Sequence, residues 1–397
     1  MTTPPSPTIA TLKDLKAALQ LAVGLELSTV PVYLTALYSI KEGANEDAQQ
    51  TIRSVVMEEM LHMTLAANVL NALGEHPSVK PVDFLSHRNV KPVPEYKDTY
   101  ESPVIAGIGK LALLPLSPAA VEGFVRIEHP LHGAAQVGDI VCPTDTFPTI
   151  GTFYEAINAA LKSRAICPDS AFRSDSPQVR DREYYGGAGQ VITVTNRDTA
   201  MAAIEKIVDE GEGLPEKRLN EPAKELPVTT KDVLNSGWKM YSHYARFREL
   251  QTGRRFRTGQ LARETPAGSL LLVDYDAVHP AVHVQRNGST TGGYEGAALN
   301  EFDLAYTQLV DDLYLAFSGG KKKVTYTMAG KVVTDLKDPL PLAVHGMYAL
   351  KNKAVALMRT PKPGDPGHTL CPRFFYADAE QRTKLKDEIK QMRGAVQ

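Results

Sequence analysis

The stretch MEEMLHM, residues 57–63, places a carboxylate and an imidazole three residues apart, at Glu59 and His62. If the stretch is helical, both side chains lie on one face of the helix, about one turn apart. Helical bundles hold dinuclear metal centres with this Glu-x-x-His spacing, because a carboxylate can bridge two cations while an imidazole nitrogen binds one. Glu58 has Leu61 at the same spacing, so Glu59 is the preferred candidate. The alternative is an exposed pair of side chains on a solvated helix face.

Two neighbouring helices are predicted around this motif. Apolar residues recur at helical spacing from Glu46 to Gly74, and the motif lies inside this stretch. An earlier helix begins at the capping box of Thr11 and Asp14 and extends to about Ile40. Because the connection between the two helices is short, they should be antiparallel neighbours.

The earlier helix carries one acidic residue, Glu26, in the apolar run LELSTVPVYL, residues 25–34. A buried carboxylate costs on the order of several kcal/mol unless it is paired or bound to a cation. Residues 19–40 contain no basic residue, so a metal ligand is favoured over a carboxylate paired to Lys or Arg at the rim of the helix pair. Tyr33 lies two turns beyond Glu26 on the same face, where it either hydrogen-bonds a ligand or fills the core.

The rest of the chain is predicted to be mainly helical. A long Pro-rich loop is expected from His76 to Leu116, and the alternating Val/Thr segment 184–196 is expected to be a strand or hairpin arm. Further helices are predicted over residues 118–129, 153–161, 197–213, 231–250, 298–317 and 339–358.

Composition limits the functional classes. The chain has 397 residues and a net charge of −2, which argues against a nucleic-acid partner. Its three cysteines include no CxxC pair, which suits a reducing compartment and excludes a thiolate metal cluster. Neither a signal peptide nor an apolar run long enough to cross a bilayer is apparent. We therefore expect a cytoplasmic protein with a small-molecule substrate and no membrane partner, and homo-oligomerisation is left open.

The runs LELSTVPVYLTALYSIKEGAN and SVVMEEMLHMTLAANVLNALG together resemble the ferritin-like family that includes the iminophenyl-pyruvate dimer synthase of violacein-type bisindole biosynthesis. The resemblance extends from about residue 12 to 376, through TIGTFYEAI, IVDEGEG, SHYARFREL, ALNEFDLAYTQLVDDLYLAF and ALKNKAVALM. It implies a mainly α fold, a ferritin-like four-helix bundle with additional helices and a few short strands. We expect a disordered N-terminus over residues 1–10, a metal-binding helical domain with long loop insertions over 11–260, and a mostly helical region over 261–397 packed on it.

The resemblance also implies a set of metal ligands. In ferritin-like di-iron proteins, a Glu on one helix and a Glu-x-x-His on the next form half of the site, and a second such set completes it. Glu26 would fill the first position, and Glu59 with His62 the second.

The second half-site is assigned to Glu212 and His243, on the third and fourth long helices. Position 240, where a Glu-x-x-His motif would have Glu, is Met, so five ligands remain for one or two ions. Alternatively, His243 is a core histidine and Glu212 ends a helix. Glu122 and Glu155 are separated by the same number of residues as Glu26 and Glu59, so they are a competing pair. Pro130 and the loop sequence after it argue against a long helical hairpin there.

Iron is the expected metal, with another divalent ion as the alternative, because carboxylates and imidazoles support Fe(II) with open positions. The family resemblance implies a metal-dependent oxidoreductase. Such an enzyme would use dioxygen or peroxide on a small, aromatic amino-acid-derived substrate in secondary metabolism. A non-catalytic metal-binding or ligand-binding ferritin-like protein is the alternative, since a fold does not fix a function.

Overall fold

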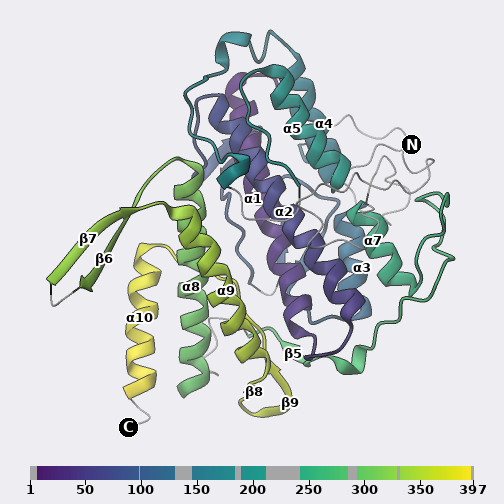
Figure 1. Ribbon diagram of the computed structural model, residues 1–397, viewed down its shortest axis with the longest axis vertical. Helices are drawn as coiled ribbons and strands as arrows, with labels where there is room; N and C mark the ends of the chain where they lie inside the picture. Colours follow the sequence, from purple (N-terminus) through teal and green to yellow (C-terminus); the bar gives the residue numbers. More distant parts are fainter. Residues whose placement is uncertain are drawn as a thin grey trace.

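The computed structural model describes residues 7–97, 99–129, 145–183, 189–211, 242–284, 293–328 and 331–394. Helices dominate these residues, and labels follow Figure 1. The longer helices are α1 (Leu12–Ser39), α2 (Glu46–Ala72), α3 (Pro118–Ile127), α4 (Ile150–Lys162), α5 (Arg197–Glu210), α7 (His243–Thr252), α8 (Gly293–Phe317), α9 (Pro339–Met358) and α10 (Ala379–Gly394). The strands are β1 (Val82–Phe84), β2 (His87–Val90), β3 (Thr99–Glu101), β4 (Lys110–Ala112), β5 (Ala281–Val282), β6 (Lys322–Met328), β7 (Lys331–Lys337), β8 (Pro361–Lys362) and β9 (Asp365–Leu370).

Helices α1 and α2 form the long antiparallel pair at the centre of the molecule (Figure 1). The Thr11 side chain caps α1 by accepting the Asp14 N–H, as the capping box predicts. The chain then reverses through Gly43 and Asn45, both of which have positive φ. Both predicted helices are confirmed to within two residues at their ends.

Four shorter helices cover this pair. Helix α4 packs against α1 and α5, α5 also contacts α2, and α3 packs against α7 (Figure 1). Side-chain caps begin these helices: Ser117 at α3, Thr149 at α4, Asn196 at α5 and Ser242 at α7. The observed fold is therefore mainly α, as predicted.

The segment predicted as a long loop, residues 76–116, contains two short antiparallel hairpins, β1–β2 and β3–β4. It crosses α1 at Gly24, where an added Cβ would lie 1.8 Å from the carbonyl oxygen of Pro92. The loop is therefore packed directly against the helix that carries Glu26.

Three expectations need correction or fall outside the described residues. Residues 189–196 form irregular chain instead of a strand, because polar side chains bind its backbone: Val194 N donates to Gln178 at 2.7 Å, and Asn68 donates to the Ile192 carbonyl at 3.2 Å. Ile9 is 2% exposed and belongs to the core, so the ordered chain starts earlier than residue 11. Residues 231–241 of the predicted helix 231–250 lie outside the described residues.

The C-terminal part of the chain adds α8, α9 and α10, with the β6–β7 hairpin extending from one end of the group (Figure 1). Helix α8 packs against both α9 and α10, and α9 also contacts α1. A buried ion pair, Arg373 Nη2 to Asp303 Oδ2 at 2.5 Å, fixes the chain after β9 to α8. The α10 helix and the hairpin were not predicted from the sequence.

Helix α1 is long and apolar enough to cross a membrane, contrary to the sequence expectation, but 89% of its most apolar window is buried inside the fold. The core therefore accounts for its composition. The boundary expected near residue 260 stays a prediction.

Candidate metal centre

Five side chains that could bind a metal meet in the interior, and each is 0% exposed. They come from four elements: α1, α2, the residue that ends α3 and the first residue of α7. The five are Glu26, Glu59, His62, Glu128 and His243. Helix ends thus deliver two of these groups to the middle of the α1–α2 pair.

His62 directs its two ring nitrogens at different carboxylates. Its Nδ1 lies 3.7 Å from Glu26 Oε2, inside the cluster. Its Nε2 lies 3.3 Å from Glu210 Oε2, at the last turn of α5. Glu210 in turn forms an ion pair with Lys206.

His243 has the same arrangement. Its Nδ1 lies 2.9 Å from Glu59 Oε1 and 3.4 Å from Glu128 Oε2, and its Nε2 lies 2.7 Å from Glu58 Oε2. Glu58 also pairs with Arg246, one turn further along α7. The two imidazole rings stack with centroids 5.4 Å apart.

In both histidines, therefore, Nε2 faces an outer carboxylate that is paired with a cation. A carboxylate that accepts the Nε2–H fixes the tautomer and leaves the Nδ1 lone pair free to bind a metal. The inward Nδ1 atoms of His62 and His243 form no hydrogen bond among the described residues.

Each of the three inner carboxylates accepts a hydrogen bond from a hydroxyl group on one of its two oxygens. Tyr154 donates to Glu26 Oε1, Thr29 donates to Glu59 Oε2 at 2.5 Å, and Tyr33 donates to Glu128 Oε1 at 2.5 Å. The remaining oxygens, Glu26 Oε2, Glu59 Oε1 and Glu128 Oε2, form no hydrogen bond within the described part of the chain. Each carboxylate thus keeps one oxygen available in the interior.

These donor atoms fit a divalent metal such as iron. Buried polar atoms without a hydrogen bond are rare and costly, and five that lack one within the described chain converge here. Ligand atoms of Glu59, His62 and His243 lie within 4.8 Å of one another. Oxygen and imidazole donors are the set that non-haem iron prefers. A Cβ on Gly211 would lie 2.9 Å from His62 Cε1 and 3.1 Å from His243 Nδ1, so the backbone closes tightly over both rings.

The charges of the cluster shift its pKa values. Burial, reinforced by the charge of Glu128, raises the pKa of Glu59 to about 7. Burial alone would lower the pKa of His62, but the hydrogen bond to Glu210 and the negative charge of Glu26 outweigh it and raise the pKa to about 9. For His243, burial is likewise outweighed by Glu128 and its other carboxylate partners, so its pKa is raised well above the usual value. Protons therefore occupy part of this site in the absence of a cation.

Four of the residues that the sequence assigned as ligands are brought together: Glu26, Glu59, His62 and His243. The fifth, Glu212, and also Met240, lie outside the described residues. Tyr33, the suggested partner of a ligand, hydrogen-bonds a carboxylate of the cluster.

Glu128 was missed. It follows Val121 and Phe124 at helical spacing and so continues the buried stripe of α3, which was the signal available in the sequence. The competing carboxylates Glu122 and Glu155 are exposed, in agreement with their rejection.

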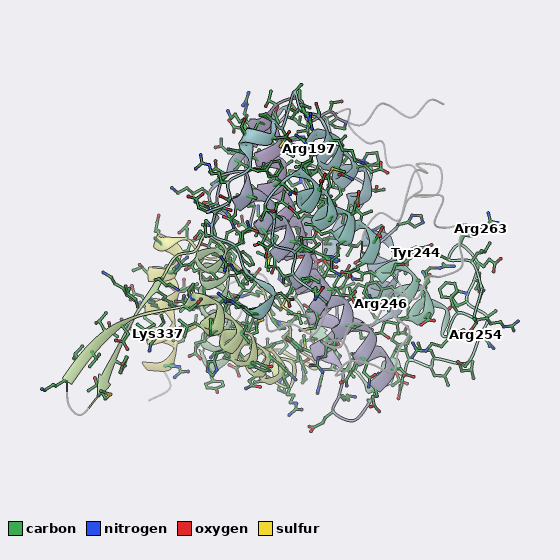
Figure 2. The ribbon with its side chains drawn as sticks, turned by 45° about the horizontal axis from the view of Figure 1, so that its top comes forward. Arg197, Tyr244, Arg246, Arg254, Arg263 and Lys337 are labelled. Atoms are coloured by element: carbon green, nitrogen blue, oxygen red, sulfur yellow. The ribbon has the colours of Figure 1, made fainter. Side chains whose placement is uncertain are left out.

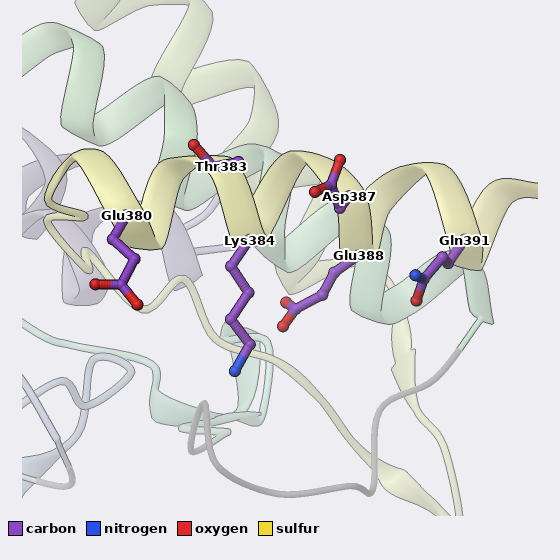
Figure 3. A pocket seen from close by; sticks show the side chains of 6 residues that line it. All are labelled: Glu380, Thr383, Lys384, Asp387, Glu388 and Gln391. Carbon is purple, nitrogen blue, oxygen red and sulfur yellow. The ribbon is translucent and has the colours of Figure 1, made fainter.

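A shallow hollow along α10 is separate from this centre. Figure 3 shows Glu380, Lys384 and Glu388, spaced four residues apart, projecting to one side of the helix. All the residues that line the hollow belong to α10, and they form an ordinary solvated helix face.

Comparison with known proteins agrees with this architecture. A family model described as Ferritin-like matches residues 19–252, which is more than half of the chain and includes all five inner residues. This chain belongs to the Ferritin-like family. The resemblance inferred from the sequence motifs is thereby confirmed at the level of the family.

Two further similarities accompany the Ferritin-like match. A ferritin like protein from Caulobacter vibrioides, of known crystal structure, is similar over 94% of this chain and 100% of its own, with 21% identity and a TM-score of 0.56, which shows the fold. Dichlorochromopyrrolate synthase from Lentzea aerocolonigenes is 28% identical over 164 residues, or 34% of this chain. The matched region spans only 15% of the length of that relative.

Proposed function

We propose that this protein is an iron-dependent oxidoreductase that uses dioxygen or peroxide to oxidise a small aromatic substrate derived from an amino acid. One observation carries the proposal: three carboxylates and two imidazoles, all fully buried, direct at one another atoms that form no hydrogen bond among the described residues. Such a cluster is costly to bury without a cation. One or two iron ions, or another divalent metal, would compensate it.

In this proposal, different residues bind the metal, exclude water and position the carboxylates. Glu26, Glu59, Glu128, His62 and His243 would hold the metal, and a bound iron centre supplies oxidation by dioxygen or peroxide. The packed rings of Tyr33, Phe124 and Phe247 lie beside Glu128 and exclude water from that side; the ring centroids of Tyr33 and Phe124 are 5.0 Å apart. The hydroxyls of Tyr33, Tyr154 and Thr29 hold the carboxylates in position.

The substrate class rests on the relative. Dichlorochromopyrrolate synthase is named for a pyrrolate, an aromatic carboxylate, so we propose that the substrate of this chain also combines an aromatic body with an acid group. The buried free thiols of Cys167 and Cys371 suit a reducing compartment, which supports a cytoplasmic location.

Metal analysis by mass spectrometry on untagged protein tests the metal centre. We expect between one and two iron ions per chain in the wild type and loss of most of the metal in His62→Ala, with an unchanged helical circular dichroism spectrum. His368→Ala is the matched control, because His368 is an exposed surface histidine. Equal metal content in the wild type and His62→Ala would refute the ligand assignment.

Oxygen uptake by the Fe(II)-loaded protein tests turnover. We expect uptake that depends on an added aromatic amino-acid-derived acid and that is absent in His62→Ala. Metal binding without substrate-dependent uptake would favour the non-catalytic alternative, a metal-binding protein of the same fold.

A further inference from the structure

A small cluster of His129, Tyr244 and Arg248 adjoins the metal centre, and none of the three is among the five inner side chains. The rings of His129 and Tyr244 meet edge to face with centroids 5.2 Å apart. His129 directly follows Glu128, and Tyr244 directly follows His243. The cluster is therefore one residue away from two inner side chains of the centre.

Helix α7 presents two adjacent faces. On the first face, His243 points at the metal centre, and Phe247, four residues further on, packs against Tyr33. Tyr244 and Arg248 have the same spacing and lie one residue further around the helix, which is about 100° of rotation. Residues four apart on a helix are neighbours, and the positive charge of Arg248 acts against the rise that burial causes in the pKa of Tyr244.

Among the described residues, Arg248 has no carboxylate partner, unlike two neighbouring arginines. Arg246 is paired with Glu58, and Arg255 is paired with Glu249 at 3.0 Å. Arg248 makes one side-chain hydrogen bond, from Nη1 to Gln251 Oε1 at 2.9 Å, and no ion pair in the described ranges. Its Nε is buried and has no hydrogen-bond partner within the part of the chain that the structure describes.

We propose that Arg248 binds the carboxylate of the substrate, with Tyr244 and His129 forming the aromatic wall beside it. The proposal rests on the proposed function, which supplies the substrate class. A guanidinium presents its N–H groups as a planar fork that matches a carboxylate and pairs with it in two parallel hydrogen bonds. A carboxylate anchored here leaves the aromatic body of the molecule directed along Tyr244 and His129 towards His243 and Glu128.

The test compares an aromatic acid with its neutral amide. Indole-3-acetate and indole-3-acetamide are titrated calorimetrically into the protein as purified, under anaerobic conditions that prevent turnover. The wild type should prefer the acid by roughly tenfold or more, as a bidentate charged pair would give. Arg248→Gln should lose this preference, and Arg248→Lys should keep only part of it, because an ammonium lacks the planar fork.

Arg254→Gln is the matched control. Arg254, six positions after Arg248, is exposed and donates a hydrogen bond to the Gly268 carbonyl, and Figure 2 shows it at the outer edge of the molecule. Its replacement should leave the preference unchanged. The proposal is overturned if the wild type has no preference for the acid, if Arg248→Gln retains the preference, or if Arg254→Gln loses it to the same extent.

The result is separable from the test of the proposed function. Metal content and circular dichroism of Arg248→Gln should equal those of the wild type, because the side-chain hydrogen bond of Arg248 goes to Gln251 and not to an inner ligand. An Arg248-dependent preference without oxygen uptake would refute the oxidase and leave the acid site standing. Oxygen uptake with an acid preference that is independent of Arg248 would do the reverse.

Discussion

Glu58 and Glu59 are consecutive on α2 and both fully buried, yet their pKa values are shifted in opposite directions. Burial raises the pKa of both carboxyls. At Glu58 this is outweighed by Arg246 and His243, which lower its pKa to about 2. At Glu59 the charge of Glu128 adds to burial and raises its pKa to about 7. In the metal-free protein the Glu58 carboxyl is therefore charged above about pH 2, whereas Glu59 is largely protonated below about pH 7 and must lose that proton to bind a metal.

Metal binding should therefore release protons. A raised pKa means that Glu59 is largely protonated below about pH 7, and His62 below about pH 9, in the metal-free protein. Metal affinity should rise with pH through both values, by at least about tenfold per pH unit between 7 and 9, where His62 still carries its proton. Calorimetric titration with Zn²⁺ at pH 7.5 in buffers of different ionisation enthalpy counts the protons. Binding without proton release would contradict the inferred charge states.

Glu128 should prove to be a ligand although it lies outside the Glu-x-x-His pattern. Glu128→Gln removes one charged donor from the cluster, and we expect metal affinity to fall by at least about tenfold. Folding should persist, since a buried amide costs less than an unpaired carboxylate. Glu122→Gln, on the exposed face of the same helix, is the control. Wild-type metal content in Glu128→Gln would assign this carboxylate a purely structural role.

The metal ligands that could be predicted from the sequence are those that follow from local spacing. Glu59 with His62 follows from a fixed helical interval, and Glu26 from a carboxylate in an apolar run without a basic neighbour. Glu58 was set aside because Leu61 occupies the matching position, but its partners, His243 and Arg246, lie on another helix. Contacts between residues so distant in the chain leave no periodic signal.

Among the elements, helix ends have a special role in this protein. Glu128 ends α3, Gly211 ends α5 and His243 begins α7, and all three meet at the α1–α2 pair. A capping side chain fixes where a helix begins and so sets the position of its first residue. Ser242 has this role for His243, because its side chain accepts the Ala245 N–H. The caps could be predicted from sequence, but the convergence of the ends depends on tertiary packing.

The crossing of the loop over α1 gives a prediction for an element. In open space Gly→Ala in a helix stabilises by about 0.5–1 kcal/mol. At Gly24 the new Cβ would lie 1.8 Å from the Pro92 carbonyl oxygen, so we expect a net loss of about 1–3 kcal/mol. Gly123, in α3, has nothing within 4 Å of its Cβ position, so Gly123→Ala should be stabilising. Chemical denaturation measures both variants, and a Gly24→Ala protein as stable as the wild type would show that the loop does not lie against α1.

The wrongly predicted strand illustrates the limit at this scale. Alternating Val and Thr in residues 190–195 favour an extended strand. The backbone there is bonded by side chains instead of by a neighbouring strand: Gln178 accepts from Val194 N, and Asp181 accepts from Val191 N at 3.2 Å. Period-two patterning predicts which residues are buried and does not specify what pairs with the backbone.

For the whole molecule, the metal centre and the fold cannot be treated separately. The buried hydrophobic residues of α1, α2, α4, α5, α8 and α9 form one continuous cluster. The five inner side chains lie within it on α1, α2, α3 and α7. Because the donors come from helices that meet only in the folded state, a metal bound there favours folded over unfolded chain.

Metal should therefore stabilise the entire fold. At a free metal concentration about a thousandfold above Kd, binding contributes about 4 kcal/mol to the free energy of unfolding. For a chain of this size we expect Tm to rise by roughly 5 °C on loading. Differential scanning calorimetry of the chelator-treated and reloaded protein measures this rise. In His62→Ala the rise should vanish, whereas His368→Ala should retain it. A Tm that does not respond to metal in the wild type would mean that the buried cluster is balanced by protons alone, as its raised pKa values allow in the metal-free state.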